Sequence, residues 1–200
     1  MASQLLHFEG ERILLVFMGL TAGGKSTLAQ QYAMQTGGIH INTDTERKKL
    51  AGLSPTQKRP DGVEQGIYSP ELTATTYEHL LDLAEEAFAR GEHLVLLDGS
   101  YSRHTYREAV RGRAEEMGAR LLFIFCFCSE QETRKRLDFR SRDVSAVSDG
   151  RWEIYLYQKK SFEFPDKEKD CLFFDTTGDP ATLTKKLASG ILKELQAGTL

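Results

Sequence analysis

The fold of this chain is decided by the stretch GLTAGGKS at residues 19–26. It matches the phosphate-binding loop pattern G-x-x-x-x-G-K-[ST] at every fixed position. Residues 12–18, before the loop, are apolar and β-prone, as expected of a buried parallel strand. Residues 26–36, after it, contain good helix formers and are stopped by Gly37 and Gly38. Strand, glycine-rich turn and helix are the setting that phosphate binding requires, so we predict a nucleotide site here.

The residue types of the loop explain how it would hold a nucleotide. Glycines allow positive φ, so successive backbone N–H groups can point at one anion, and the following helix adds the positive end of its dipole. Lys25 is expected to contact the β and γ oxygens, and the Ser26 hydroxyl to bind Mg²⁺. The predicted nucleotide contacts in this region are Gly19, Thr21, Ala22, Gly23, Gly24, Lys25, Ser26 and Thr27.

Length and composition limit the class of protein. A chain of 200 residues suits one domain, 1–200. With 26 Lys and Arg against 29 Asp and Glu, the net charge of −3 indicates no general polyanion-binding surface, although a local basic groove remains open. The first ten residues lack the pattern of a secretory signal, and the apolar run at 121–128 is too short to span a bilayer. Three cysteines, an odd count, argue against a disulfide framework, so we expect a cytoplasmic protein without a membrane partner.

Further β-prone runs alternate with helical segments along the chain. Four more strands are predicted, at residues 38–42, 93–98, 119–128 and 170–175. This alternation predicts an α/β fold with a doubly wound, five-stranded parallel sheet.

Asp44 follows the second predicted strand and opens a helix. Thr43 or Asp44 can cap that helix, and Glu46 supports its first turn. Ligands bind at the carboxyl edge of strands in open α/β sheets. Asp44 is therefore either a functional group facing the phosphate-binding loop or a cap alone, and we favour the functional interpretation.

The third predicted strand ends in Asp98. A carboxylate at this position matches the acid that holds Mg²⁺ through water in phosphate-binding-loop proteins. Arg103 and Arg107 then begin a helix predicted over 102–117. Cations at a helix N-terminus oppose the dipole, which indicates an anionic partner; ordinary surface arginines are the alternative.

An arginine-rich segment follows the fourth predicted strand. A helix is predicted over 130–139, and a further helix over 152–164. The segment of about 136–150 is interpreted as a helical lid whose arginines close over the polyphosphate, with a solvated helix face as the alternative. The polar stretch 52–66 is expected to pass over the site.

Together these motifs resemble P-loop kinases of the adenylate-kinase-like superfamily. The chain is most similar to the small-molecule kinases grouped with polynucleotide 5′-hydroxyl kinases, gluconate kinase, chloramphenicol phosphotransferase and zeta-toxin-type kinases. The resemblance covers nearly the whole chain. It rests on residues 19–26, Asp44 with Arg47, Lys48 and Leu50, residues 66–71, Leu97-Asp98 with Arg103, and residues 136–142.

The resemblance implies an ATP-dependent phosphotransferase that uses Mg²⁺ and an alcohol acceptor. In such kinases the acid after the second strand is the general base, a role that falls here on Asp44. The lid arginines correspond to Arg140 and Arg142, with Arg136 beside the nucleotide. The loop after the last strand flanks the adenine, which implies Thr176 and Gly178. The expected acceptor contacts are Asp44, Arg47 and Arg103, and the expected Mg²⁺ ligands are Ser26 and, through water, Asp98.

The sequence leaves the acceptor and the oligomeric state open. We rank a hydroxyl-bearing small molecule first, a nucleic-acid 5′-hydroxyl end second, a zeta-toxin-like acceptor third, and a non-catalytic nucleotide-binding or switch module last. A GTPase would need a guanine-reading Asn-Lys-x-Asp, which the sequence lacks. Residues 175–178 match its D-x-x-G element, but they follow the last predicted strand. ATP is therefore the expected nucleotide.

Overall fold

The computed structural model describes residues 10–54, 57, 65–142 and 151–197, except for the side chains of residues 140–142. Its centre is a five-stranded sheet in the order β2-β3-β1-β4-β5, with every neighbouring pair parallel. The strands are β1 (Arg12–Met18), β2 (Ile39–Asn42), β3 (Leu94–Asp98), β4 (Ala119–Phe127) and β5 (Cys171–Asp175). The predicted doubly wound sheet is thereby confirmed.

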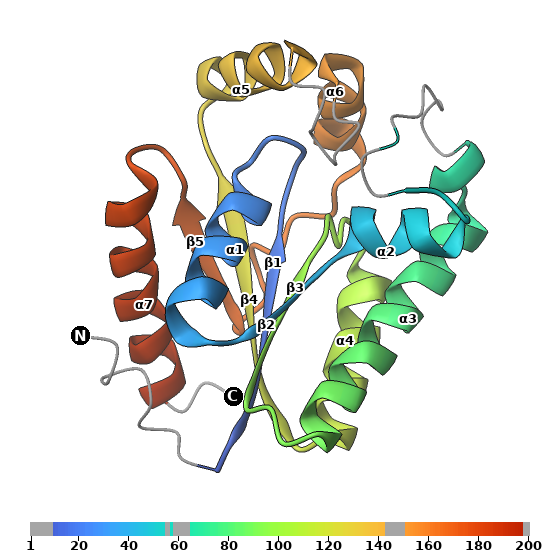
Figure 1. Ribbon diagram of the computed structural model, residues 1–200. Coiled ribbons are helices and arrows are strands. Elements are labelled where there is room, and N and C mark those ends of the chain that lie inside the picture. Colours follow the sequence, from blue (N-terminus) through green and yellow to red (C-terminus); the bar gives the residue numbers. More distant parts are fainter. Residues whose placement is uncertain (1–9, 55–56, 58–64, 143–150, 198–200) are drawn as a thin grey trace.

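Helices cover both faces of this sheet and its carboxyl edge. Helices α1 and α7 lie on one face and α3 and α4 on the other, while α5 and α6 lie above the carboxyl ends of the strands (Figure 1). The helices are α1 (Lys25–Thr36), α2 (Thr43–Leu50), α3 (Pro70–Ala89), α4 (His104–Glu116), α5 (Glu130–Arg142), α6 (Trp152–Ser161) and α7 (Pro180–Gln196), with a short 3-10 helix at Gly66–Tyr68.

Strand β1 is buried on both faces, as its continuous apolar run predicts. Ile13, Leu15 and Phe17 pack with α1 and α7. Leu14, Val16 and Met18 pack with α3 and α4 on the opposite face. Burial of one such side chain stabilises the fold by about 1.5–3 kcal/mol. The loop that follows β1 is therefore held at the end of the best-buried strand.

A third apolar cluster joins the phosphate-binding loop to the helices above it. Ala22 of the loop packs with Leu137 of α5 and Tyr155 of α6. The Arg134 guanidinium carbon lies 3.6 Å from the centre of the Trp152 ring, which ties α5 to α6. Helices α5 and α6 thus contact the loop directly.

Three helix boundaries differ from the prediction by two residues or more. Helix α5 continues beyond the predicted end at 139 to Arg142, in a segment rich in the good helix former arginine. Helix α6 ends at Ser161, before the predicted 164, because Phe162 takes an extended conformation and buries its ring against Phe125. Helix α4 begins at His104, two residues after the predicted start. No helix in the described part of the chain has the length and apolarity needed to cross a bilayer.

Candidate active site

The start of α1 provides an anion site at the carboxyl edge of β1. Gly24 is its N-cap with φ of 87°, no side chain caps the helix, and its first turn holds no acidic residue. The first backbone N–H groups of α1 are therefore left for a ligand, at the positive end of the helix dipole.

The backbone of the phosphate-binding loop packs closely on β4. A Cβ atom at Gly23 would lie 2.8 Å from the Cys126 carbonyl oxygen, and one at Gly19 would overlap the same oxygen. Ala22 has a positive φ of 58°, a left-handed conformation that costs a non-glycine residue about 1–2 kcal/mol. The loop conformation is therefore set by the strand beneath it as well as by its own glycines.

Side chains of the phosphate-binding loop and of α6 form hydrogen bonds with backbone groups of the loop. Lys25 Nζ donates to the Leu20 carbonyl oxygen over 2.8 Å. The Thr21 N–H donates to Gln158 Oε1 of α6 over 2.7 Å. Gln158 could not be identified from the sequence, because no motif marks a glutamine so far along the chain from the loop. Its role follows only from the packing of α6.

Asp98 is buried beside β2, at 1 % exposed. Asn42 Nδ2 donates to its carboxylate over 2.6 Å, and His40 Nε2 lies 3.3 Å from the same oxygen. Burial raises the pKa of Asp98, but the His40 hydrogen bond and the Lys25 charge outweigh this and leave the pKa lowered, with Ser26 adding to the effect. Asp98 is thus held ionised next to Ser26.

The residues predicted to bind Mg²⁺ fit that ion. Ser26 and Asp98 bring a hydroxyl and a carboxylate oxygen together, and Mg²⁺ prefers oxygen ligands while keeping several waters and binding substrate phosphates. Within the described ranges, no group of three or more His, Cys, Asp and Glu could enclose a metal. A metal completed by phosphate and water agrees with this donor set.

Asp44 is not the cap of α2, so that part of the prediction is wrong. The N-cap is Asn42, whose side chain accepts from the Thr45 N–H over 3.0 Å. Asn42 is the last residue of β2, paired with Asp98 of β3, and this pairing places the end of the extended backbone at Asn42. Thr43 then starts the helix and donates to the Asp98 carbonyl oxygen over 2.7 Å. The Asp44 carboxylate is consequently not used for capping.

The environment of Asp44 disfavours its charge. Burial raises its pKa, the Arg47 charge lowers it, and the Asp98 charge raises it, with a net upward shift. A carboxylate with a raised pKa is suited to accept a proton near neutral pH.

Two cavities meet at the phosphate-binding loop. One has a volume of about 450 Å³ and the other of about 1000 Å³. Gly24, Ser26, Asn42 and Asp44 line both of them. The start of α1 therefore separates two binding spaces that share one edge.

The larger cavity brings together residues from three distant segments. Thr27, Arg136, Thr176 and Gly178 line it, as do the shared loop residues. Arg136 donates to the Ala22 carbonyl oxygen over 3.2 Å and to both the hydroxyl and the carbonyl oxygen of Thr176, over 3.0 and 2.8 Å. The predicted nucleotide residues at the end of β5 thus lie beside the loop. Phe139, 75 % exposed, also lines this cavity.

The smaller cavity contains the residues predicted to contact the acceptor. Asp44 and Arg47 of α2 and Arg103 at the N-cap of α4 line it. Its other walls include Tyr68 beside α3 and Tyr157 of α6. The side chains of Arg140 and Arg142, and residues 143–150 of the predicted lid, lie outside the described residues.

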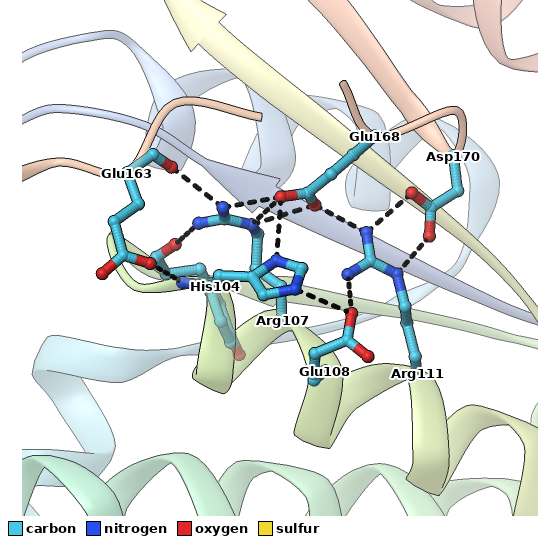
Figure 2. A network of polar contacts seen from close by, with 8 residues as sticks. His104, Arg107, Glu108, Arg111, Glu163, Glu168 and Asp170 are labelled. Carbon is cyan, nitrogen blue, oxygen red and sulfur yellow. Dashed lines mark hydrogen bonds and ion pairs between the residues drawn. The ribbon is translucent and has the colours of Figure 1, made fainter. Parts of the chain in front are cut away.

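Arg107 does not face a ligand, although its position in the sequence indicated an anionic partner. The partner is Glu168 of the same chain, which accepts from Arg107 Nε over 2.9 Å and from Nη2 over 2.6 Å (Figure 2). Arg107 is 1 % exposed and also donates to the Tyr101 and Glu163 carbonyl oxygens. We call this group the α4 network; it comprises His104, Arg107, Glu108, Arg111, Glu163, Glu168 and Asp170. It fixes the segment at Glu163, which lines the smaller cavity.

Comparisons with known proteins agree with this geometry. A family model described as an AAA domain matches residues 14–165. No curated protein matches the chain significantly by sequence.

Solved structures share the fold at low sequence identity. A gluconokinase from Sinorhizobium meliloti 1021 has a TM-score of 0.63 and 17 % identity, over 90 % of this chain and 92 % of that one. An APS kinase from Mycobacterium tuberculosis, in complex with AMPPNP and APS, has a TM-score of 0.62 and 17 % identity, over 93 % and 98 %. A shikimate kinase from Aquifex aeolicus vf5 has a TM-score of 0.59 and 14 % identity, over 92 % and 99 %.

Proposed function

Since the chain belongs to the AAA-domain family of P-loop kinases, we propose that it transfers the γ-phosphoryl group of ATP to a hydroxyl group of a small molecule. The observation that supports this best is the carboxylate of Asp44. It is free of the helix cap, has a raised pKa, and lies on the edge shared by the two cavities. A nucleotide-binding module without chemistry would have no need for such a group.

The two cavities suggest how the substrates divide the site. The adenine occupies the larger cavity, beside Arg136, Thr176 and Gly178, where Phe139 offers an aromatic face. The phosphates follow the loop, bound by the amides of residues 22–27 and by Lys25. The acceptor occupies the smaller cavity, with Arg47 and Arg103.

Asp44 acts as the general base in this proposal. The acceptor oxygen attacks the γ-phosphorus, its proton passes to the Asp44 carboxylate, and the bond to ADP breaks. Ser26 and Asp98 would hold Mg²⁺, directly and through water, and the ion would offset charge on the β and γ oxygens. By the family resemblance, Arg140 and Arg142 would stabilise charge on the transferred phosphoryl group.

The test is a screen for ADP release with sugars, nucleosides, aminoglycosides and 5′-hydroxyl oligonucleotides. Lys25→Ala should lose most ATP affinity or turnover and remain folded, because it removes the charge that contacts the β and γ oxygens. Lys193→Ala, an exposed lysine on α7, is the matched control and should behave as the wild type. Unchanged ATP binding and hydrolysis in Lys25→Ala contradicts the assignment.

A further inference from the structure

Arg47 is a buried cation in the wall of the smaller cavity. It is 4 % exposed, and its Nη1 atom donates to the Ile67 carbonyl oxygen over 3.1 Å and to Thr73 Oγ1 over 3.0 Å. Its guanidinium carbon lies 5.2 Å from the centre of the Tyr68 ring. Its Nε atom is buried without a hydrogen-bond partner, and within the described part of the chain no carboxylate forms an ion pair with it.

This arrangement leaves Arg47 without a salt-bridge partner among the described residues. Buried ionic groups are normally paired, because removing a charge from water costs several kcal/mol that neutral acceptors only partly offset. Asp44 is close enough for Arg47 to lower its pKa, yet the pKa of Asp44 remains raised overall. Asp44 therefore acts on Arg47 through its charge alone, and no hydrogen bond or ion pair joins the two side chains.

A guanidinium is shaped to bind one class of ligand group. Its planar set of N–H donors matches the two oxygens of a carboxylate or the oxygens of a phosphate. Nη1 is already bonded to protein, and within the described part of the chain the remaining donors of Arg47 have no protein partner, while the residue lines the cavity. An anion in the cavity would pair with the guanidinium directly.

We infer that the phosphoryl acceptor is a small hydroxy compound carrying a carboxylate or phosphate group, which binds Arg47 while the reacting hydroxyl lies at Asp44. This inference rests on the proposed function. Asp44 and Arg47 are three residues apart on α2, a spacing that puts Cβ atoms about 5–6 Å apart on one helix face. One molecule of sugar-acid size therefore reaches both side chains. Tyr68 and Tyr157 supply apolar surface for its carbon skeleton.

The experiment compares matched pairs of compounds that differ in the anionic group. The carboxylate arm pairs glycerate with glycerol and gluconate with sorbitol. The phosphate arm pairs adenosine 3′-monophosphate with adenosine, and a 5′-hydroxyl oligonucleotide is added. Binding is measured as a shift in melting temperature with Mg²⁺ and AMPPNP present, which requires no chemistry. ADP release with ATP is measured separately.

In at least one pair, the charged member should bind the wild type about ten times more tightly than its neutral partner. Arg47→Met should remove this preference, and Arg47→Lys should retain part of it. Thr73→Val removes one hydrogen bond of Arg47 without changing charge, and should keep the preference. Arg113→Gln, on the far end of α4, controls for loss of a distant charge and should also keep it.

Several results would overturn the inference. These are binding of no charged compound, equal binding within every pair, binding of the oligonucleotide alone, or a preference unchanged in Arg47→Met. Arg47-dependent binding without ADP release would sustain the inference about the ligand and defeat the proposed kinase activity. Transfer only to neutral acceptors would support the proposed kinase activity and contradict the inference about the ligand.

Discussion

Two buried arginines on different helices have opposite surroundings. Arg107 of α4 is saturated, with both oxygens of Glu168 and two carbonyl oxygens around it. Arg47 of α2 has neutral acceptors and, among the described residues, a buried Nε without a partner. A buried cation whose counter-charge belongs to its own chain holds the fold together. A buried cation without one has a place for a ligand. Burial and residue type are the same, so the partners decide the role.

The largest expected effect is on phosphoryl transfer, in the variant Asp44→Asn. Asp44 lies on the same helix as Arg47. Loss of a positioned base should lower phosphoryl transfer by about 10²–10⁴-fold. Stability should not fall at neutral pH. Because the folded state raises the pKa of Asp44, its ionised form opposes folding once the pH exceeds the ordinary value of 3.8, and asparagine removes that charge.

Transfer rates and melting temperatures between pH 3 and pH 8 check this prediction. The variant should melt at or above the wild-type temperature near pH 7, and the two curves should converge at low pH. Asp98→Asn is the control with the opposite sign, because the lowered pKa of Asp98 means that its charge favours folding. Nearly full transfer by Asp44→Asn would require the base to be another residue.

The next effect concerns the α4 network. Arg107→Met leaves the Glu168 carboxylate without its main partner and should cost about 3–5 kcal/mol of unfolding free energy. Arg47→Met should cost clearly less, because no carboxylate in the described part of the chain forms an ion pair with Arg47. Urea unfolding of both variants measures the difference. In the double variant Arg107→Met with Glu168→Met, much of the loss should be recovered. Equal losses at Arg47 and Arg107 would erase the distinction drawn between them.

The smallest expected effect is the loss, at acid pH, of the stability that the α4 network contributes. Burial raises the pKa of Glu168, but hydrogen bonds from Arg107 and Arg111 outweigh it and lower the pKa from 4.5 to about 2. The stability that Glu168 contributes is therefore present above about pH 4.5 and is lost as the pH falls towards 2. Melting curves of the wild type should fall across this window more steeply than those of Glu168→Gln. Parallel curves would show that the network does not respond to acid.

The fold and the phosphate-binding loop were readable from sequence because each rests on a local pattern. An apolar run followed by a glycine-rich turn predicts a buried strand from its own residues, without knowledge of the helices that pack on it. The parallel direction of the strands follows from their alternation with helices, and it brings Ser26 and Asp98 to the same carboxyl edge. The order of the five strands was not predicted. Strong local signals therefore predicted the sheet and the residues at its carboxyl edge.

The errors concern features that depend on pairing between distant segments. The cap of α2 falls on Asn42 because β2 pairs with Asp98, and three adjacent residues at this point were all capable caps. The partner of Arg107 is 61 residues away, in a loop with no motif. Gln158 reaches Thr21 only because α6 packs on the loop. No local pattern distinguishes such residues from ordinary surface side chains.

The Cys126 carbonyl oxygen, which lies beneath the loop, limits which substitutions can inactivate the protein without displacing its backbone. Any residue larger than glycine at 19 or 23 would push the loop away from β4. Such a variant would lose activity through a displaced backbone, and its failure would say nothing about phosphate contacts. Substitutions that change only the ends of the Lys25 or Asp44 side chains leave the contact between the loop and β4 intact. Cellular experiments that need an inert copy of this protein should therefore leave the glycines alone.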